Sequence, residues 1–333
     1  MRFSTRFVLA VLILLLVSSG MLFGGGQAQR DARPEYTLRF GHLANEENSW
    51  HRAAVFFADE VRERSGGRIE VQVYPNEQLG TELQMLNAIQ AGTADMTITG
   101  GSLVNWIPRI GVMETPATIR DQEHLVRVAS GPIGQEIEAE IIEEGGFRPI
   151  AYFIRGPRHL TSNRPINTPE DARGLIVRVP NSPLYVAFWE EVGATPTPMA
   201  FSEVFTSLQQ GTIHAQENPL ALIHSAGFYE VQQYVNVTEH LHTWIYVVIG
   251  EEKFQSMPAD LQEIIIDVGQ EMQAYEHQLF LEDEERLADE LQARGMIFNT
   301  DVDQEAFTRV GQPGIVRSLT PEQRELWERI VAE

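Results

Sequence analysis

Segments with β-strand character alternate with helical segments along the first hundred residues, and this alternation restricts the fold more than any other feature. Residues 36–40 and 69–74 alternate between apolar and polar side chains, as half-buried strands do. Residues 49–64, between them, place apolar side chains at helical spacing, and a second helical segment (81–90) leads to a short strand (95–99). This order predicts parallel strands joined by right-handed helical crossovers, and therefore the α/β class.

A second α/β section is expected to begin near residue 156. It follows a segment predicted as one helix, residues 122–144, and a strand over residues 148–154. Residues 176–179 then predict a further strand, and residues 184–192 a helix that ends at a glycine. Roughly 300 residues after the N-terminal segment suffice for two domains.

Residues 258–294 predict one long helix or a kinked pair of helices. After the initial proline this segment has no proline and a single internal glycine, Gly269. Its apolar residues recur at helical spacing: Leu261, Ile264, Ile265, Val268, Met272, Tyr275, Leu279, Leu287 and Leu291. A continuous helix of about 35 residues is roughly 50 Å long. Because that length exceeds a small domain, we expect the helix to span two.

The N-terminus predicts export. Arg2 and Arg6 precede an apolar stretch, residues 7–17, and small residues follow up to Ala28. This is the pattern of a signal peptide over residues 1–28, cleaved after Ala28. The alternative is an uncleaved membrane anchor, but the apolar stretch is shorter than the roughly 20 residues that span a bilayer. We therefore expect a periplasmic protein.

Composition excludes several functions. The formal charge is −22, which argues against nucleic acid and anionic lipid as partners but leaves an anionic ligand possible where a few arginines gather. The chain has no cysteine, so cysteine nucleophiles, thiolate zinc sites and iron–sulfur clusters are excluded. We expect no metal and no cofactor.

Catalytic motifs are missing from the sequence. It contains no G-x-S-x-G, H-E-x-x-H, P-loop or dinucleotide fingerprint, and we predict that the protein is not an enzyme. The competing hypothesis is an exported α/β enzyme that acts on carboxylates with an acid–base pair drawn from Glu46, Glu82 and His51. His240 and His242 stand two residues apart, and buried, hydrogen-bonded histidines explain this spacing better than a metal site.

Two arginines and an asparagine are the candidate ligand contacts. Arg178 lies in a strand between two valines, so it points to the face opposite them and needs either a ligand carboxylate or an internal acidic partner. Arg158 follows a strand end, where α/β proteins bind ligands, although a plain surface arginine fits as well. Asn218 precedes a proline that restricts its backbone, and a turn explains it equally.

Five segments occur in an order and spacing that identify a family. They are residues 75–80, 92–96, 163–180, 193–211 and 215–219. Together they resemble the DctP-type solute-binding proteins of TRAP transporters, over nearly the whole chain after the signal peptide. One departure is His214-Ala215, where the family often has an acidic residue before Gln-Glu-Asn.

The resemblance implies a two-lobed periplasmic-binding-protein-like α/β fold with a ligand cleft between the lobes and a long helix spanning both. We expect lobe I to comprise residues 34–155 and about 243–275, and lobe II residues 156–242 and about 276–333. It also implies a monomer that delivers a small organic acid to integral membrane TRAP subunits.

The resemblance further implies roles for the candidate residues. Arg178 would form a two-bond salt bridge with the ligand carboxylate, Arg158 would be a second basic contact, and Asn218 would lie at the cleft floor. Other side chains are candidates to reach the cleft, either as polar contacts or as apolar walls: Asn45, Glu46, His51, Glu82, Trp106 and Phe201. Carboxylates suit hydroxyl donors, so a sugar acid (a hexuronate or hexonate) is favoured over a C4-dicarboxylate or keto acid. Core packing is the alternative for the aromatic residues.

Overall fold

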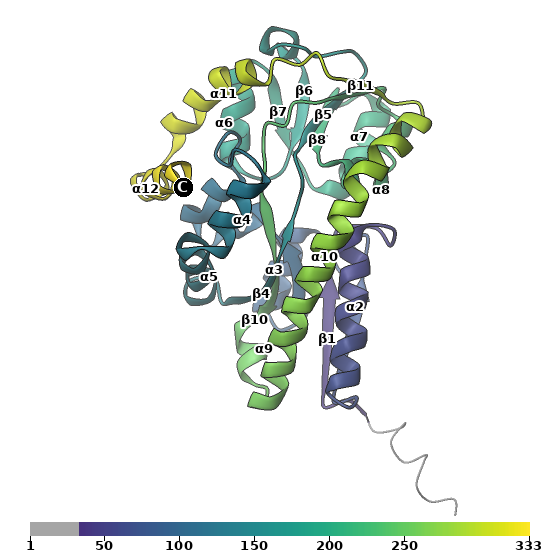
Figure 1. Ribbon diagram of the computed structural model, residues 1–333, viewed down its shortest axis with the longest axis vertical. Helices are drawn as coiled ribbons and strands as arrows, with labels where there is room; N and C mark the ends of the chain where they lie inside the picture. The colour runs from purple at the N-terminus through teal and green to yellow at the C-terminus, as the bar shows by residue number, and fades with distance from the viewer. Residues whose placement is uncertain (1–32) are drawn as a thin grey trace, which may run out of the picture.

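Two β-sheets organise the protein, as the computed structural model shows for residues 33–333 (Figure 1). The predicted signal peptide, residues 1–28, lies outside the described residues. Within residues 33–333, none of the helices combines the length and hydropathy that a bilayer-spanning segment needs.

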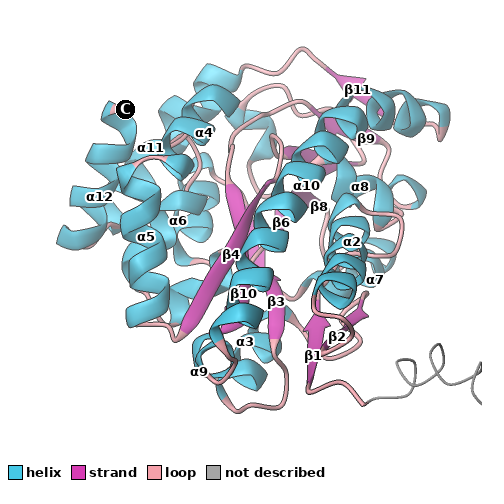
Figure 2. Ribbon diagram, turned by 60° about the horizontal axis from the view of Figure 1, so that its bottom comes forward, coloured by secondary structure: helices cyan, strands magenta, loops and turns pink. Residues whose placement is uncertain are grey.

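The first sheet has the strand order β2-β1-β3-β10-β4. Its strands are β1 (Tyr36–Gly41), β2 (Ile69–Tyr74), β3 (Met96–Thr99), β4 (Phe147–Ile154) and β10 (Trp244–Gly250). The predicted parallel pairing is confirmed where β1 pairs with β2 and with β3. β10 differs, because it is antiparallel to both β3 and β4 and lies between them. The chain thus returns to the first sheet after building much of the second (Figure 2).

The second sheet has the order β11-β9-β5-β8-β6-β7. Its strands are β5 (His159–Ser162), β6 (Ile176–Val179), β7 (Thr195–Pro198), β8 (Ala215–Asn218), β9 (Tyr234–Asn236) and β11 (Ile297–Asn299). β6 is parallel to β7 and to β8, whereas β5 is antiparallel to β8 and β9. We call the part built on the first sheet the first lobe and the part built on the second sheet the second lobe.

Helices cover both sheets. In the first half of the chain they are α2 (Ser49–Arg64), α3 (Glu82–Gln90), α4 (Gln122–Ser130), α5 (Pro132–Glu143) and α6 (Pro183–Val192). In the second half they are α7 (Val204–Gln210), α8 (Leu220–Ser225), α9 (Glu251–Gln255), α10 (Ala259–Ala293), α11 (Gln304–Ser318) and α12 (Pro321–Ala332). Short 3-10 helices include η1 (Gly101–Asn105), η2 (Pro108–Glu114), η3 (Pro169–Ala172), η4 (Phe201–Glu203) and η5 (Phe228–Glu230).

The single helix predicted over residues 122–144 is wrong. The chain breaks at Gly131, and Pro132 begins α5. Proline lacks an amide hydrogen and its ring clashes with the preceding turn, so it is tolerated in the first turn of a helix but not inside one.

The predicted long helix is confirmed as α10, a continuous helix of 35 residues that reaches both lobes (Figure 1). Its first half packs on α2 and β4, and its second half on α8. Gly269 allows a close approach, because a Cβ atom there would lie 2.5 Å from the backbone oxygen of Ile150 in β4. The internal glycine therefore reflects packing against the sheet.

The two C-terminal helices pack on different parts of the chain. α11 lies on α6, where Gly311 would place a Cβ atom only 2.2 Å from the ring of Phe188. α12 instead contacts η2 and its surroundings, where Trp327 donates to the hydroxyl of Thr118 (3.0 Å). The expected assignment of all residues after about 276 to the second lobe stays a prediction.

Candidate functional site: the cleft between the lobes

One cleft is lined by residues of both lobes. It holds about 620 Å³ of space free of protein atoms, part of it open to solvent. The first lobe contributes three acidic side chains to its lining: Glu77, Glu82 and Glu114. The segment between β4 and β5 adds Arg155, and the second lobe adds Arg178. One wall of the cleft is therefore acidic and the other has a basic residue.

Arg178 lies on β6, and the alternation of that strand sends its side chain to the face opposite Val177 and Val179. Its Nε and Nη2 atoms donate to the backbone oxygen of Met199 at 3.1 and 2.7 Å. Its guanidinium carbon also lies 5.9 Å from the centre of the Phe201 ring. Among the described residues, no carboxylate forms an ion pair with Arg178.

Burial makes this unpaired cation costly. Only 4% of Arg178 is exposed. Burial lowers the pKa of Arg178 to about 10, Glu217 opposes this effect, and the nearby Arg158 and Arg155 add to it. A buried cation without an anionic partner is unfavourable, so an anion that enters the cleft would remove an existing penalty.

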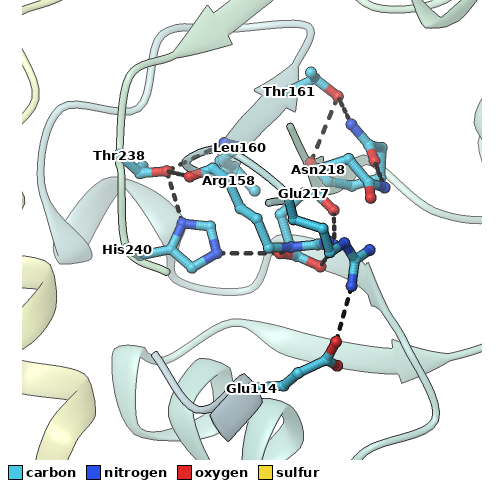
Figure 3. A network of polar contacts seen from close by, with 10 residues as sticks. Glu114, Arg158, Leu160, Thr161, Glu217, Asn218, Thr238 and His240 are labelled. Atoms are coloured by element: carbon cyan, nitrogen blue, oxygen red, sulfur yellow. Dashed lines mark hydrogen bonds and ion pairs between the residues drawn. The ribbon is translucent and has the colours of Figure 1, made fainter. Parts of the chain in front are cut away.

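Arg158 has a different environment, a polar network with Glu217 and His240 (Figure 3). It is fully buried and donates through Nε and Nη2 to the two carboxylate oxygens of Glu217, at 2.5 and 2.7 Å. Nη2 also donates to the backbone oxygen of Glu217 at 2.6 Å. This bidentate geometry is the strong form of an arginine–carboxylate pair. Arg158 does not line the cleft, and its buried Nη1 has no partner among the described residues.

Glu217 and His240 extend the network. Burial alone would raise the pKa of Glu217, but Arg158 lowers it to about 2. Burial lowers the pKa of His240, and Glu217 opposes that shift. His240 Nε2 lies 3.1 Å from Glu217 and Nδ1 lies 2.9 Å from the hydroxyl of Thr238. A neutral imidazole that donates from Nε2 and accepts at Nδ1 satisfies both contacts.

Asn218 ends β8 at the cleft. It is 1% exposed, lines the cleft, and donates through Nδ2 to Gln216 Oε1 at 2.6 Å. Its Oδ1 makes no hydrogen bond with any described residue. Pro219 follows and begins the turn into α8, which fixes the backbone of Asn218 in an extended conformation.

The acidic wall consists of three differently positioned glutamates. Glu82, in the first turn of α3, accepts from the hydroxyl of Thr99 (2.7 Å) and the amide of Gly100 (3.0 Å). Burial raises the pKa of Glu77, and the nearby Ser202 of the other lobe opposes the rise. Burial also raises the pKa of Glu114, with Arg155 opposing.

Several predicted site residues do not line the cleft. Trp106 packs edge-to-face on Phe147 of the core, with ring centres 5.5 Å apart. His51 Nδ1 lies 3.2 Å from His42 Nε2. Glu46 is exposed on the loop before α2, and Asn45 of that loop donates to the backbone oxygen of Ser225 in α8 at 2.7 Å. Of the predicted residues, Arg178, Asn218, Glu82 and Phe201 line the cleft.

The sequence analysis missed three charged residues of the cleft: Glu77, Glu114 and Arg155. Glu77 follows Asn76, and both have a positive φ (54° and 57°), a conformation that is uncommon outside glycine. In the sequence, this backbone conformation is indicated only by the Asn-Glu pair that follows Pro75. Glu114 and Arg155 stand in segments without a distinctive pattern.

Comparison with known proteins identifies the family. The profile described as "Bacterial extracellular solute-binding protein, family 7" (DctP) matches residues 40–320. The chain belongs to the DctP family of solute-binding proteins. It is therefore a transport protein and not an enzyme, and its two sheets and long helix form the two-lobed fold of TRAP solute-binding proteins.

Three relatives illustrate the family. A solute-binding protein of Roseobacter denitrificans is 48% identical over 90% of this chain and 92% of its own. Its crystal structure with bound L-galactonate has a TM-score of 0.87 and covers 90% of this chain and 99% of that chain. The 2,3-diketo-L-gulonate-binding periplasmic protein of Escherichia coli is 34% identical over 82% of this chain and 83% of its own. A TRAP solute-binding protein of Sulfurospirillum deleyianum with bound succinate is 27% identical, with a TM-score of 0.85, and covers 90% of this chain and 99% of that chain.

Proposed function

We propose that this DctP-family protein is a periplasmic subunit that captures a sugar acid, a hexonate or hexuronate, and delivers it to TRAP membrane subunits. The observation that supports this most directly is Arg178, a buried arginine at the cleft without an acidic partner among the described residues. Its planar guanidinium can meet a carboxylate with two parallel hydrogen bonds.

The opposite wall favours hydroxyl groups on the rest of the ligand. Ionised glutamates only accept hydrogen bonds, so Glu77 and Glu82 suit a polyol chain. They would repel a second carboxylate. The relatives from Roseobacter denitrificans and Escherichia coli, whose names or structures refer to L-galactonate and 2,3-diketo-L-gulonate, agree with a sugar acid.

Asn218 and the arginines complete the proposed contacts. The free Oδ1 of Asn218 can accept from a ligand hydroxyl, and rotation of the amide would offer its nitrogen to the carboxylate. A direct contact from Arg158 stays a prediction; only its Nη1 is without a partner in the described structure. Phe201 supplies an apolar surface beside Arg178.

A C4-dicarboxylate is the second candidate ligand. The succinate-bound relative from Sulfurospirillum deleyianum shows that the fold accommodates one. In this chain a dicarboxylate would need a second free cation, and the other arginine at the cleft, Arg155, is ion-paired with Glu114 at 3.0 Å.

Ligand binding would favour closure of the lobes. A sugar acid held by Arg178 on one wall and by glutamates on the other contacts both lobes only when they are close together. Such a ligand stabilises the closed state by its differential affinity for the two states. We propose that the closed surface of a monomer is what the membrane subunits recognise.

A thermal-shift screen of residues 29–333 tests the proposal. Uronates, aldonates, dicarboxylates and keto acids are compared at equal concentration. A ligand that binds only the folded state stabilises it by about 4 kcal/mol at a thousandfold excess over Kd. We expect the largest shift with a sugar acid and no such shift in the Arg178→Ala variant. The absence of a shift with every carboxylate would contradict the proposed function.

A further inference from the structure

Glu114 is an acidic residue at the cleft that is almost completely enclosed. It ends η2, is 2% exposed, and accepts a hydrogen bond at Oε1 from Arg155 Nη1 at 3.0 Å. The side chains of Arg155 and Glu114 are 10% and 3% exposed. This ion pair is therefore shielded from water, unlike the many surface pairs of this acidic protein.

The backbone next to Glu114 leaves room for its carboxylate. A Cβ atom at Gly100 would lie 2.2 Å from Oε1, and one at Gly101 would lie 2.4 Å from Oε2. Both distances are far below van der Waals contact, so any larger residue at these two positions would force the carboxylate of Glu114 to shift. The Gly-Gly pair after β3 is thus explained by the position of Glu114.

The pair alters the charge that the cleft offers to a ligand. Two arginines line the cleft, Arg155 and Arg178. Arg155 is paired with Glu114, whereas within the described part of the chain Arg178 donates only to the backbone oxygen of Met199. A single positive charge is left without an anionic partner among the described groups that line the cleft.

Resting on the proposed function, we propose that Glu114 determines the number of carboxylates on the ligand. By forming an ion pair with Arg155, it leaves Arg178 as the one arginine at the cleft without an anionic partner among the described residues, and the cleft selects a monocarboxylate over a dicarboxylate. Specificity of this kind comes from an unfavourable interaction with the wrong ligand as much as from attraction to the right one. The second carboxylate would meet Glu114, Glu82 and Glu77 without a free cation.

The variant Glu114→Gln tests this role because glutamine keeps the shape and removes the charge. Arg155 would then be free to bind a second carboxylate. The probes are L-galactonate and galactarate, which share a C6 skeleton and have one and two carboxylates, compared by calorimetry at low salt. If another sugar acid gives the largest shift in the thermal screen, that acid and the aldarate of the same skeleton replace the pair.

We expect the wild type to bind L-galactonate more tightly than galactarate, and the Glu114→Gln variant to reduce this preference by about tenfold or more, as one gained charge-assisted contact implies. Glu46→Gln is the control. It removes one negative charge from an exposed position that does not line the cleft, and it leaves Arg155 paired with Glu114, so we expect the preference to change less than about threefold. An equal change in both variants would overturn the inference, because the net charge of the protein would then explain the selectivity.

Two further measurements separate the outcomes. The double variant Glu114→Gln/Arg155→Gln replaces the pair by two neutral amides, and we expect the wild-type preference to return. If Glu114→Gln does not fold, the affinities of the wild type still test the inference. Equal affinity of the wild type for the aldonate and the aldarate would contradict the inference and leave the proposed function intact. A wild type that binds no carboxylate contradicts the proposed function instead.

Discussion

Arg178 and Arg158 are twenty residues apart, both buried, and in opposite electrostatic situations. Arg158 is enclosed by Glu217 through two side-chain contacts, and although burial alone would lower its pKa, Glu217 raises the pKa above the ordinary value. Arg178 has a lowered pKa and, among residues 33–333, hydrogen-bonds only to a backbone oxygen. Removing a buried arginine from an internal carboxylate leaves that carboxylate unpaired, whereas a buried arginine without such a partner can pair with an anionic ligand. The difference predicts that the two residues respond differently to substitution.

Replacing Arg178 should affect binding far more than folding. Arg178→Ala removes one member of the proposed buried ion pair with the ligand carboxylate, which is expected to cost about 3–5 kcal/mol, or roughly two to three and a half decades in Kd. Calorimetry with the sugar acid identified in the screen measures this loss. The exposed Arg173, on the same lobe, provides the control Arg173→Ala. An Arg178→Ala variant that binds within about threefold of the wild type would show that Arg178 is not the anchor.

Replacing Arg158 should have the reverse effect. Arg158→Ala leaves Glu217 buried and unpaired, which is expected to lower the free energy of unfolding by about 3–5 kcal/mol. Urea denaturation without ligand measures this change, and Arg178→Ala serves as the comparison. A stability loss below about 1 kcal/mol would contradict the structural role. The affinity of the folded fraction shows whether Nη1 contacts the ligand.

A conservative change at Arg178 sharpens the geometric claim. Arg178→Lys keeps the charge but cannot form two parallel hydrogen bonds, and the loss of one charge-assisted bond is expected to weaken binding by about 1.5–3 kcal/mol. If lysine bound the sugar acid as tightly as arginine, charge alone would account for the site. The comparison requires that Arg178→Lys and the wild type unfold at similar urea concentrations.

The Arg158 network should also respond to pH. His240 has a pKa lowered by burial, so below about pH 6.5 the unfolded chain binds a proton that the folded protein resists. The associated stability is present above that pH and is lost as pH falls toward the folded pKa. Between pH 7.5 and 5.5 we therefore expect the contribution of His240 to the free energy of unfolding to decrease. His240→Gln keeps a donor for Glu217 but does not titrate.

The pH experiment is controlled by comparing how the stability of the wild type and of His240→Gln changes with pH. Other groups also titrate in this range, including Glu284, whose pKa burial raises to about 7 and which acts in the opposite direction. These contributions are common to the wild type and His240→Gln, so the change in stability with pH should be smaller in the variant by the His240 contribution. Identical pH profiles would show that His240 is not held neutral by its surroundings.

The smallest effects are expected at the predicted residues that do not line the cleft. Glu46 is exposed, and Glu46→Gln should change affinity for the sugar acid by less than about threefold. Glu82→Gln, at the cleft, should weaken binding of L-galactonate by about 1 kcal/mol if it accepts a ligand hydroxyl. A larger effect of Glu46→Gln would require a ligand position different from the one proposed.

The sequence predicted well the features that depend on local pattern. The apolar spacing of residues 258–294 identified α10, and the valines on either side of Arg178 placed its side chain opposite them. It predicted less well the features that depend on partners distant in the chain. Arg158 and Glu217 are 59 residues apart, and the sequence between them does not indicate that they pair.

The split between α4 and α5 could have been predicted, because Pro132 is visible in the sequence and proline disfavours a helix interior. The antiparallel position of β10 could not, because it depends on the chain's return from the second sheet to the first. Glu114 and Arg155 were likewise missed. Their significance depends on two segments that meet only when the fold is complete.

The position of β10 bears on the order in which the protein can fold during its synthesis. The middle of the first sheet is filled by residues 244–250, and α12, at the C-terminus, packs on the region of η2. Neither part is available until most of the polypeptide has been made. Long-range contacts of this kind slow folding, so the nascent chain has no complete N-terminal domain to fold early.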